Sequence, residues 1–176
     1  MDKLRMPSGA KETLLYTGFI MVAYELVRGM IVEPIRLFYK DSKFQNGMPF
    51  NSYENDVLAL HKNEFEACLL YLKDHMEALD SADILNVQAL RKHRNDLAHN
   101  LPRLIGMLDI TENQTMLTKV TETLYKLSKY RAYMEIGCDP DCREIDWDGE
   151  VKGYEFLMFE QVVNAIRELN LHLSDP

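Results

Sequence analysis

The sequence predicts an all-α protein, a bundle of about five helices with one small β-hairpin near residues 143–154. Two features of the chain indicate this class: long segments in which apolar side chains recur every three or four residues, and short clusters of Gly, Pro, Asn and Ser between them. The length of 176 residues with 47% apolar side chains allows one core that needs no disulfides or metal to hold it. We therefore expect one helical domain over residues 1–176.

Residues 11–39 predict the first helix, which is apolar on most faces and therefore belongs at the centre of the bundle. Its apolar stretch has about the length of a membrane span, yet it contains Glu25 and Arg28. A single Arg costs roughly 2.5–3.5 kcal/mol at the middle of a bilayer, so we expect a buried core helix and no membrane contact. Pro34 should kink this helix or end its first part.

The remaining predicted helices each carry an apolar stripe at about 100° per residue. They cover residues 53–79, 81–101, 112–136 and 155–173. Residues 41–52 have the composition of a loop. Ser81 is the expected cap of the third helix, without a full capping box, and Pro102 should bend or end that helix. Gly137 should terminate the fourth helix.

The charge of the chain is unevenly distributed. The formal net charge is −8, with 28 acidic residues against 20 Lys and Arg, which disfavours a protein that holds nucleic acid by its overall field. Residues 86–103, however, carry a net +3 and two further histidines, His93 and His99, whereas residues 139–150 carry −5. Any chemistry on nucleic acid must therefore be local to this basic segment.

The cysteines indicate a reducing compartment and no metal. There are three in the chain, an odd number, and no signal peptide is apparent at the start, so we expect a cytoplasmic protein. Cys138 and Cys142 are too few to fill a tetrahedral zinc site, so an acidic turn before the hairpin is the simpler prediction. The hairpin itself follows from the alternating pattern around Asp148-Gly149. We expect neither a metal nor another cofactor.

Arg94 has an unusual place on the third predicted helix. Leu90, Leu97 and Leu101 fall within roughly 20° of a common line and form its apolar seam, and Arg94 lies about 40° from Leu90. A permanently charged guanidinium beside the seam must find a partner or reach an opening, because an unpaired buried charge is costly. An ion pair with Glu25 of the first helix and a functional role are both compatible with this position.

His99 lies roughly 140° around the helix from Arg94, so the two side chains cannot enter one pocket from one straight helix. Asn95, four residues before His99, is on the same face as the histidine. Either the helix is distorted near Pro102, or the two side chains meet with help from a second copy of the chain.

The segment Arg94-Asn95-Asp96-Leu97-Ala98-His99 resembles the signature of the HEPN superfamily (higher eukaryotes and prokaryotes nucleotide-binding). That signature is an Arg, commonly followed by a polar residue, and a His separated from the Arg by four to six residues, late in a helix. The resemblance implies an all-helical bundle and a metal-independent endoribonuclease of a toxin-antitoxin, abortive-infection or RNA-processing system. It also implies a homodimer with the two motifs facing one another across a cleft. An antitoxin or defence-system partner fits this class.

The resemblance assigns roles to particular residues. His99 takes the proton from the ribose 2′-hydroxyl, and Arg94 stabilises the charge that develops on the phosphate. Asn95 hydrogen-bonds the phosphate or orients His99. Arg91, Lys92 and Arg103 form a solvated face that can touch RNA phosphates, and His93 is given no role. Some relatives carry a Tyr two residues after the motif His; here that residue is Leu101, so regulation through this tyrosine is not implied.

Two other hypotheses fit the same residues. In the first, the fold is HEPN-like but not catalytic, and the protein is a helical module that binds RNA, a nucleotide or another protein. In the second, the chain is a structural bundle, with Arg94 in an internal ion pair and a six-residue match that arose by chance.

Overall fold

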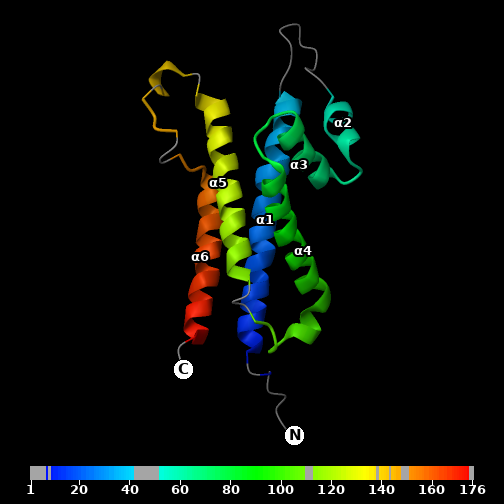
Figure 1. Cartoon of the computed structure of the whole chain (residues 1–176), viewed down its shortest axis with the longest axis vertical. Coiled ribbons are helices and arrows are strands. Elements are labelled where there is room, and N and C mark those ends of the chain that lie inside the picture. The colour runs from blue at the N-terminus through cyan, green and yellow to red at the C-terminus, as the bar shows by residue number, and fades with distance from the viewer. Residues whose placement is uncertain are drawn as a thin grey trace.

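The computed structural model describes residues 7, 9–41, 52–109, 113–137, 139–142, 144–147 and 151–174. These residues form helices and connecting turns and contain no strand, which confirms the all-α class (Figure 1). The α-helices are α1 (Ala10–Asp41), α2 (Tyr53–Asp56), α3 (Glu64–Asp74), α4 (Ser81–Leu104), α5 (Gln114–Ile136) and α6 (Tyr154–Ser174). Two short 3-10 helices, η1 (Leu58–Leu60) and η3 (Pro140–Cys142), accompany them.

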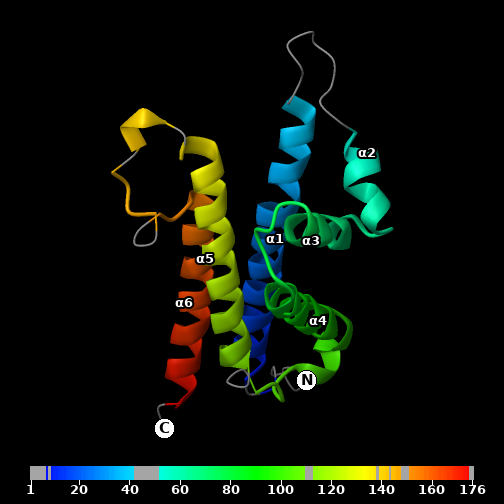
Figure 2. The same ribbon diagram turned by 45° about the horizontal axis from the view of Figure 1, so that its top comes forward.

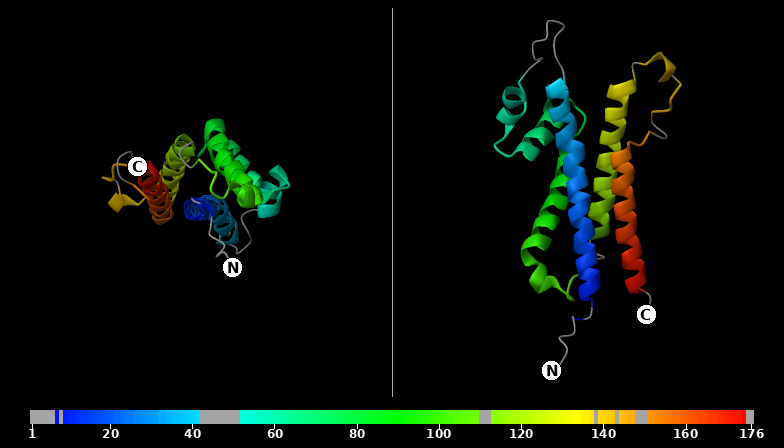
Figure 3. Two further views of the ribbon diagram at one scale, coloured as in Figure 1. Left: turned by 90° about the horizontal axis from the view of Figure 1, so that it is seen from below. Right: turned by 180° about the vertical axis from the view of Figure 1, so that it is seen from behind.

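Helix α1 is the centre of the bundle. It packs against α3, α4 and α6, and α5 packs against both α4 and α6 (Figures 1 and 2). The views from below and behind show α1 and α6, from opposite ends of the described chain, running side by side (Figure 3). All five of these helices contribute to one hydrophobic core. Its largest fully buried side chains include Tyr16, Ile20, Leu69, Leu97, Leu124, Phe156 and Phe159.

The length and composition of α1 alone would allow it to cross a membrane, and no other helix in the described ranges passes that test. Half of its most apolar stretch is buried inside the bundle, and core helices of soluble proteins pass the same test. Pro34 lies inside α1, which continues to Asp41, so the proline does not end the helix. At the other end, Thr13 Oγ1 accepts a hydrogen bond from the Gly106 amide (3.3 Å), which ties the turn after α4 to the start of α1.

The predicted single helix over residues 53–79 is wrong. Two short helical pieces, α2 and η1, occupy its first part, and the backbone of His61 is extended. Asn63 then caps α3, with its side-chain oxygen accepting a hydrogen bond from the Glu66 amide (3.2 Å). An Asn side chain that accepts a backbone N–H in this way favours the start of a new helix over the continuation of the previous one. The break could not be recognised from the sequence because the apolar stripe continues across it.

The ends of the other helices follow the sequence more closely. Gly137 terminates α5 as predicted, and its amide donates to the Tyr133 carbonyl (2.7 Å). Helix α4 passes through Pro102 and ends at Leu104, three residues later than predicted. A proline in the last turn removes only one helical hydrogen bond, so it does not stop the helix at once.

The predicted hairpin is not confirmed. Residues 144–147 and 151–153 form no strand, and the other residues between them lie outside the described part of the chain. The Trp147 ring makes a T-shaped contact with the ring of Tyr133 on α5, with centroids 5.5 Å apart. An isolated two-stranded hairpin is only marginally stable in water. Here the contact between Trp147 and Tyr133 holds the connecting segment against α5 instead.

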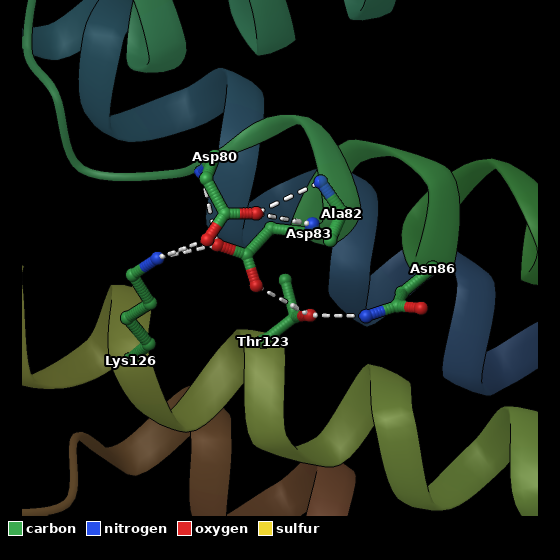
Figure 4. Close-up of polar contacts among 6 residues, drawn as sticks. All are labelled: Asp80, Ala82, Asp83, Asn86, Thr123 and Lys126. Carbon is green, nitrogen blue, oxygen red and sulfur yellow. Dashed lines mark hydrogen bonds and ion pairs between the residues drawn. The ribbon is translucent and has the colours of Figure 1, made fainter.

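Helix α4 begins with a capping box one residue earlier than predicted. Asp80, not Ser81, is the N-cap, and its side chain accepts hydrogen bonds from the amides of Ala82 (2.8 Å) and Asp83 (2.9 Å). In the reverse direction, the Asp80 amide donates a hydrogen bond to the Asp83 carboxylate (3.0 Å), as Figure 4 shows. The expectation of a cap without a full box is therefore also wrong, because the shift of one residue places Asp83 at the third helical position.

Asp83 also joins α4 to α5. Its carboxylate is buried (9% exposed) and accepts hydrogen bonds from Thr123 Oγ1 (3.0 Å) and Lys126 Nζ (2.6 Å) (Figure 4). Thr123 in turn accepts from the Asn86 amide group (3.2 Å). The Asp83 carboxylate is the main cause of the raised pKa of Lys126. This polar network fixes the position of α4, and therefore of the basic segment, against α5.

Candidate functional site

The basic segment, residues 86–103, lies within α4, a helix that is continuous through residues 94–99. The apolar seam is confirmed at Leu90 and Leu97, which are fully buried. Because α4 packs against α1, Arg94 reaches the surface of α1, whereas His99 is exposed on another side of α4. No contact joins the Arg94 and His99 side chains within the described part of one chain, as the 140° separation predicts.

Arg94 is held by three neighbours. Its Nη2 donates to Glu25 Oε1 (3.3 Å), its Nη1 donates to Asn95 Oδ1 (2.9 Å), and its guanidinium lies over the Tyr24 ring, 4.7 Å from the centroid. The ion pair with Glu25, which the sequence left as one interpretation, is thus present. Each terminal nitrogen uses one N–H in these contacts and keeps a second for another acceptor.

The ion pair with Glu25 is easily exchanged. The Glu25 side chain is 57% exposed, and an ion pair between partly solvated side chains is worth about 0–1 kcal/mol. An RNA phosphate, which offers several acceptor oxygens, can therefore compete with this carboxylate for the guanidinium. Arg94 Nε is buried and has no hydrogen-bond partner among the described residues. The neighbours of Arg94 thus hold its guanidinium in place but leave some of its N–H donors without an acceptor.

Asn95 contacts Arg94 and not His99. Its side-chain oxygen accepts from the guanidinium, and no hydrogen bond to the imidazole is recorded in the described ranges. Of the two predicted tasks for Asn95, orientation of His99 has no support from this geometry. Its amide nitrogen remains a donor for a phosphate oxygen.

Arg91 is already occupied by α3. It forms an ion pair with Glu66, and its guanidinium lies 5.7 Å from the centroid of Phe65. Gln88 donates to the same Glu66 carboxylate (3.0 Å). This cluster fastens α4 to α3, so Arg91 belongs to the packing of the bundle more than to an RNA-contacting surface.

Lys92 and Arg103, which were predicted to share a solvated face with Arg91, share an exposed face with His99 instead. All three are exposed, and spacings of seven and four residues on one helix place them within about 20° of a common line. The structure records no ion pair for any of them within the described residues. The spacing was visible in the sequence, but only the confirmed helix through Leu104 extends the face to Arg103.

His93 was given no role from the sequence, yet it is a half-buried contact between α4 and α1. Its Nε2 is 2.8 Å from the hydroxyl of Tyr16, a fully buried side chain. Burial lowers the pKa of His93 and raises that of Tyr16. Its position four residues before Leu97 was the signal in the sequence, because that spacing puts it near the apolar seam. His93 is a structural histidine, distinct from the exposed His99.

The lowered pKa of His93 makes stability depend on pH. Below pH 6.5 the unfolded chain takes up a proton on this residue more readily than the folded chain does. The free energy of unfolding should therefore fall as the pH drops from about 7 to 5, by more in the wild type than in His93→Gln. Urea denaturation at both pH values measures this difference. An equal loss in the two proteins would contradict it.

The cysteine segment forms the predicted turn. The Cys142 amide donates to the Asp139 carbonyl (3.0 Å), and Asp139 Oδ1 accepts from the Asp141 amide (2.9 Å). Cys142 is a free thiol, as is the buried Cys68, and Cys138 lies outside the described residues. Within the described ranges no group of three or more His, Cys, Asp or Glu side chains is arranged to hold a metal ion.

Comparison with known proteins gave no relative. No family model, no curated protein and no solved structure matches the chain.

Proposed function

We propose that this protein is a metal-independent endoribonuclease that acts as a homodimer, with Arg94, Asn95 and His99 of α4 at the site of cleavage. One observation supports it best. Arg94, at the surface between α1 and α4, keeps N–H donors that no described neighbour occupies, and His99, five residues later on the same helix, is exposed. The resemblance of this segment to the HEPN signature gives the reaction. A toxin-antitoxin, abortive-infection or RNA-processing system is the expected setting.

The reaction uses only side-chain acid–base chemistry. His99 accepts the proton of a ribose 2′-hydroxyl, and the 2′-oxygen then forms a bond to the adjacent phosphorus. The bond from phosphorus to the 5′-oxygen breaks, and this oxygen leaves with a proton from the partner's imidazolium or from water. The products are a 2′,3′-cyclic phosphate and a 5′-hydroxyl. Arg94 stabilises the charge that accumulates on the phosphate oxygens, and the amide of Asn95 donates to one of them.

Two copies of the chain supply what one copy does not. Arg94 and His99 point about 140° apart, so a facing α4 helix brings the arginine of one chain toward the histidine of the other. The exposed face of Lys92, His99 and Arg103 then lies along the RNA backbone, and dimerisation doubles the local positive charge. The acidic remainder of the chain limits non-specific binding.

A complementation assay tests this arrangement. Purified protein is incubated with single-stranded RNA in excess EDTA, and the product ends are analysed by mass spectrometry. We expect cleavage with 2′,3′-cyclic phosphate ends. Arg94→Ala and His99→Ala homodimers are then mixed and allowed to exchange subunits, and a heterodimer should recover part of the activity because it holds one intact Arg and one intact His. No recovery after verified exchange would contradict a shared site.

The ion pair between Arg94 and Glu25 favours one other candidate, a non-catalytic helical module that binds RNA, a nucleotide or another protein. In such a module the ion pair joins α1 to α4 and no RNA is cut. Expression in a bacterial host separates the two. The nuclease predicts growth arrest that is lost with His99→Ala, and the module predicts neither arrest nor cleavage. Glu25→Gln adds a second test, because the release of Arg94 should preserve or increase cleavage by a nuclease.

A further inference from the structure

A mostly apolar pocket lies between α1, α3 and α5, away from the segment that carries Arg94. Its volume is about 290 Å³. Buried side chains of α1, α3 and α5 form its floor, among them Met30, Ile35, Leu72 and Leu127. Half-exposed apolar side chains, Phe38 (50% exposed) and Met134 (59% exposed), stand at its opening. The pocket therefore has an apolar interior that is reached from the surface.

Two charged side chains of α5 line the pocket, Glu135 and its ion-pair partner Arg131. Arg131 is the one cationic side chain of this lining. Its Nε is buried and has no hydrogen-bond partner among the described residues. Its Nη2 is 3.6 Å from Glu135 Oε1, beyond ordinary hydrogen-bond distance, and the Glu135 side chain is 67% exposed. Glu135 can therefore turn into solvent at little cost, and the guanidinium keeps donors for an anion at the edge of the apolar pocket.

We propose that this pocket binds a single-chain amphipathic carboxylate, with its alkyl chain on the apolar floor and its carboxylate on Arg131. The positive charge of Arg131 selects a carboxylate as the polar group of the bound molecule, because a guanidinium donates two parallel hydrogen bonds to a carboxylate. The volume decides the length of the chain. A liquid water molecule occupies about 30 Å³, and a methylene group is of similar size, so the pocket holds roughly ten non-hydrogen atoms. An eight-carbon fatty acid anion has this size.

Three methionines make the pocket directly observable. Met30, Met76 and Met134 line it, whereas Met107 and Met158 do not. Protein labelled with ¹³C at the methionine methyl groups is titrated with octanoate, which stays monomeric at millimolar concentration, and followed by NMR. We expect saturable shifts of the three pocket methyls and none of the other two. Octanol and octylammonium, which have the same chain with a neutral or cationic head, should bind about tenfold or more weakly.

Two variants separate the contribution of charge from that of apolar contact. Arg131→Gln should weaken octanoate binding by about tenfold or more and leave octanol binding unchanged. Glu135→Gln removes a competing carboxylate and should tighten octanoate binding. Since the two changes act in opposite directions at exposed or partly exposed positions, a loss of binding through misfolding cannot imitate both.

Several results would overturn the proposal. They are equal affinity for octanoate and octylammonium, shifts of Met107 and Met158 along with the pocket methyls, and the absence of saturation. A change in sedimentation coefficient on addition of octanoate would also overturn it, because the pocket would then belong to an interface between proteins. None of these measurements depends on RNA cleavage, so they leave the proposed nuclease function untouched.

Discussion

Replacement of Arg94 or of His99 by alanine should lower the rate of RNA cleavage by about 10²–10³. For Arg94 the reason is the loss of a positioned guanidinium that stabilises charge in the transition state, whereas the substrate in its ground state gains less from it. For His99 the reason is the loss of the base that accepts the 2′-hydroxyl proton. The rate constant is measured under single-turnover conditions with a fluorescent RNA in EDTA.

Stability measurements show whether these losses are chemical or structural. The ion pair of Arg94 with the exposed Glu25 contributes only about 0–1 kcal/mol, and the contact with the Tyr24 ring contributes about 0.5–1 kcal/mol, so Arg94→Ala should lower the free energy of unfolding by no more than about 2 kcal/mol. Arg167→Ala on α6 and His75→Ala after α3 are matched controls, since both side chains are exposed and lie outside α4, which carries the motif. Cleavage that survives in Arg94→Ala or His99→Ala would remove these residues from the mechanism.

The Arg94→Lys variant separates the effect of positive charge from that of guanidinium geometry. Lysine keeps the charge but loses the planar fork that pairs with two phosphate oxygens. If the guanidinium geometry matters, the rate should stay well below that of the wild type. If charge alone is needed, lysine should restore most of it.

Asp83→Ala should lower the free energy of unfolding by about 3 kcal/mol, the largest stability change predicted for this chain. The substitution breaks half of the capping box with Asp80 and takes the acceptor from Thr123. Among the described residues it leaves Lys126 with only the exposed Asp80 as an ion-pair partner. The urea-induced unfolding transition, followed by circular dichroism, measures the loss.

Two further variants locate the source of that stability. Asp83→Asn keeps an acceptor oxygen and should recover part of the loss, because only the charge is removed. Asp74→Ala, which removes an exposed carboxylate at the end of α3, should change the free energy of unfolding by less than about 0.5 kcal/mol. A wild-type-like Asp83→Ala would mean that this network does not hold α4 to α5.

The helices that the sequence predicted well are those whose ends are set locally. Gly137 after α5 is a local signal, and so is the apolar periodicity of α1 and α6. The second predicted helix failed because Leu58 and Phe65 continue one stripe across a break that the Asn63 cap creates. Periodicity records which face is apolar and says little about where the backbone turns.

The candidate site divides in the same way. Helical geometry was sufficient to place Arg94 beside the seam and to separate it from His99. An ion pair with Glu25 was one of two interpretations of Arg94, and the structure contains it. It was not sufficient for Arg91, whose ion pair with Glu66 depends on where α3 packs. Nor did it single out Arg131, because a pocket formed by three helices has no signature in any one of them.

The packing of α1 against α6 sets the order in which the chain can mature on the ribosome. About 110 residues separate the end of α1 from the start of α6, and synthesis at roughly 5–20 residues per second takes several to about 20 s to bridge them. During that interval the face of α1 that α6 will cover, on a helix apolar enough to span a membrane, meets water or a chaperone. The apolar face of α1 that α6 covers is therefore synthesised well before the helix that shields it from water.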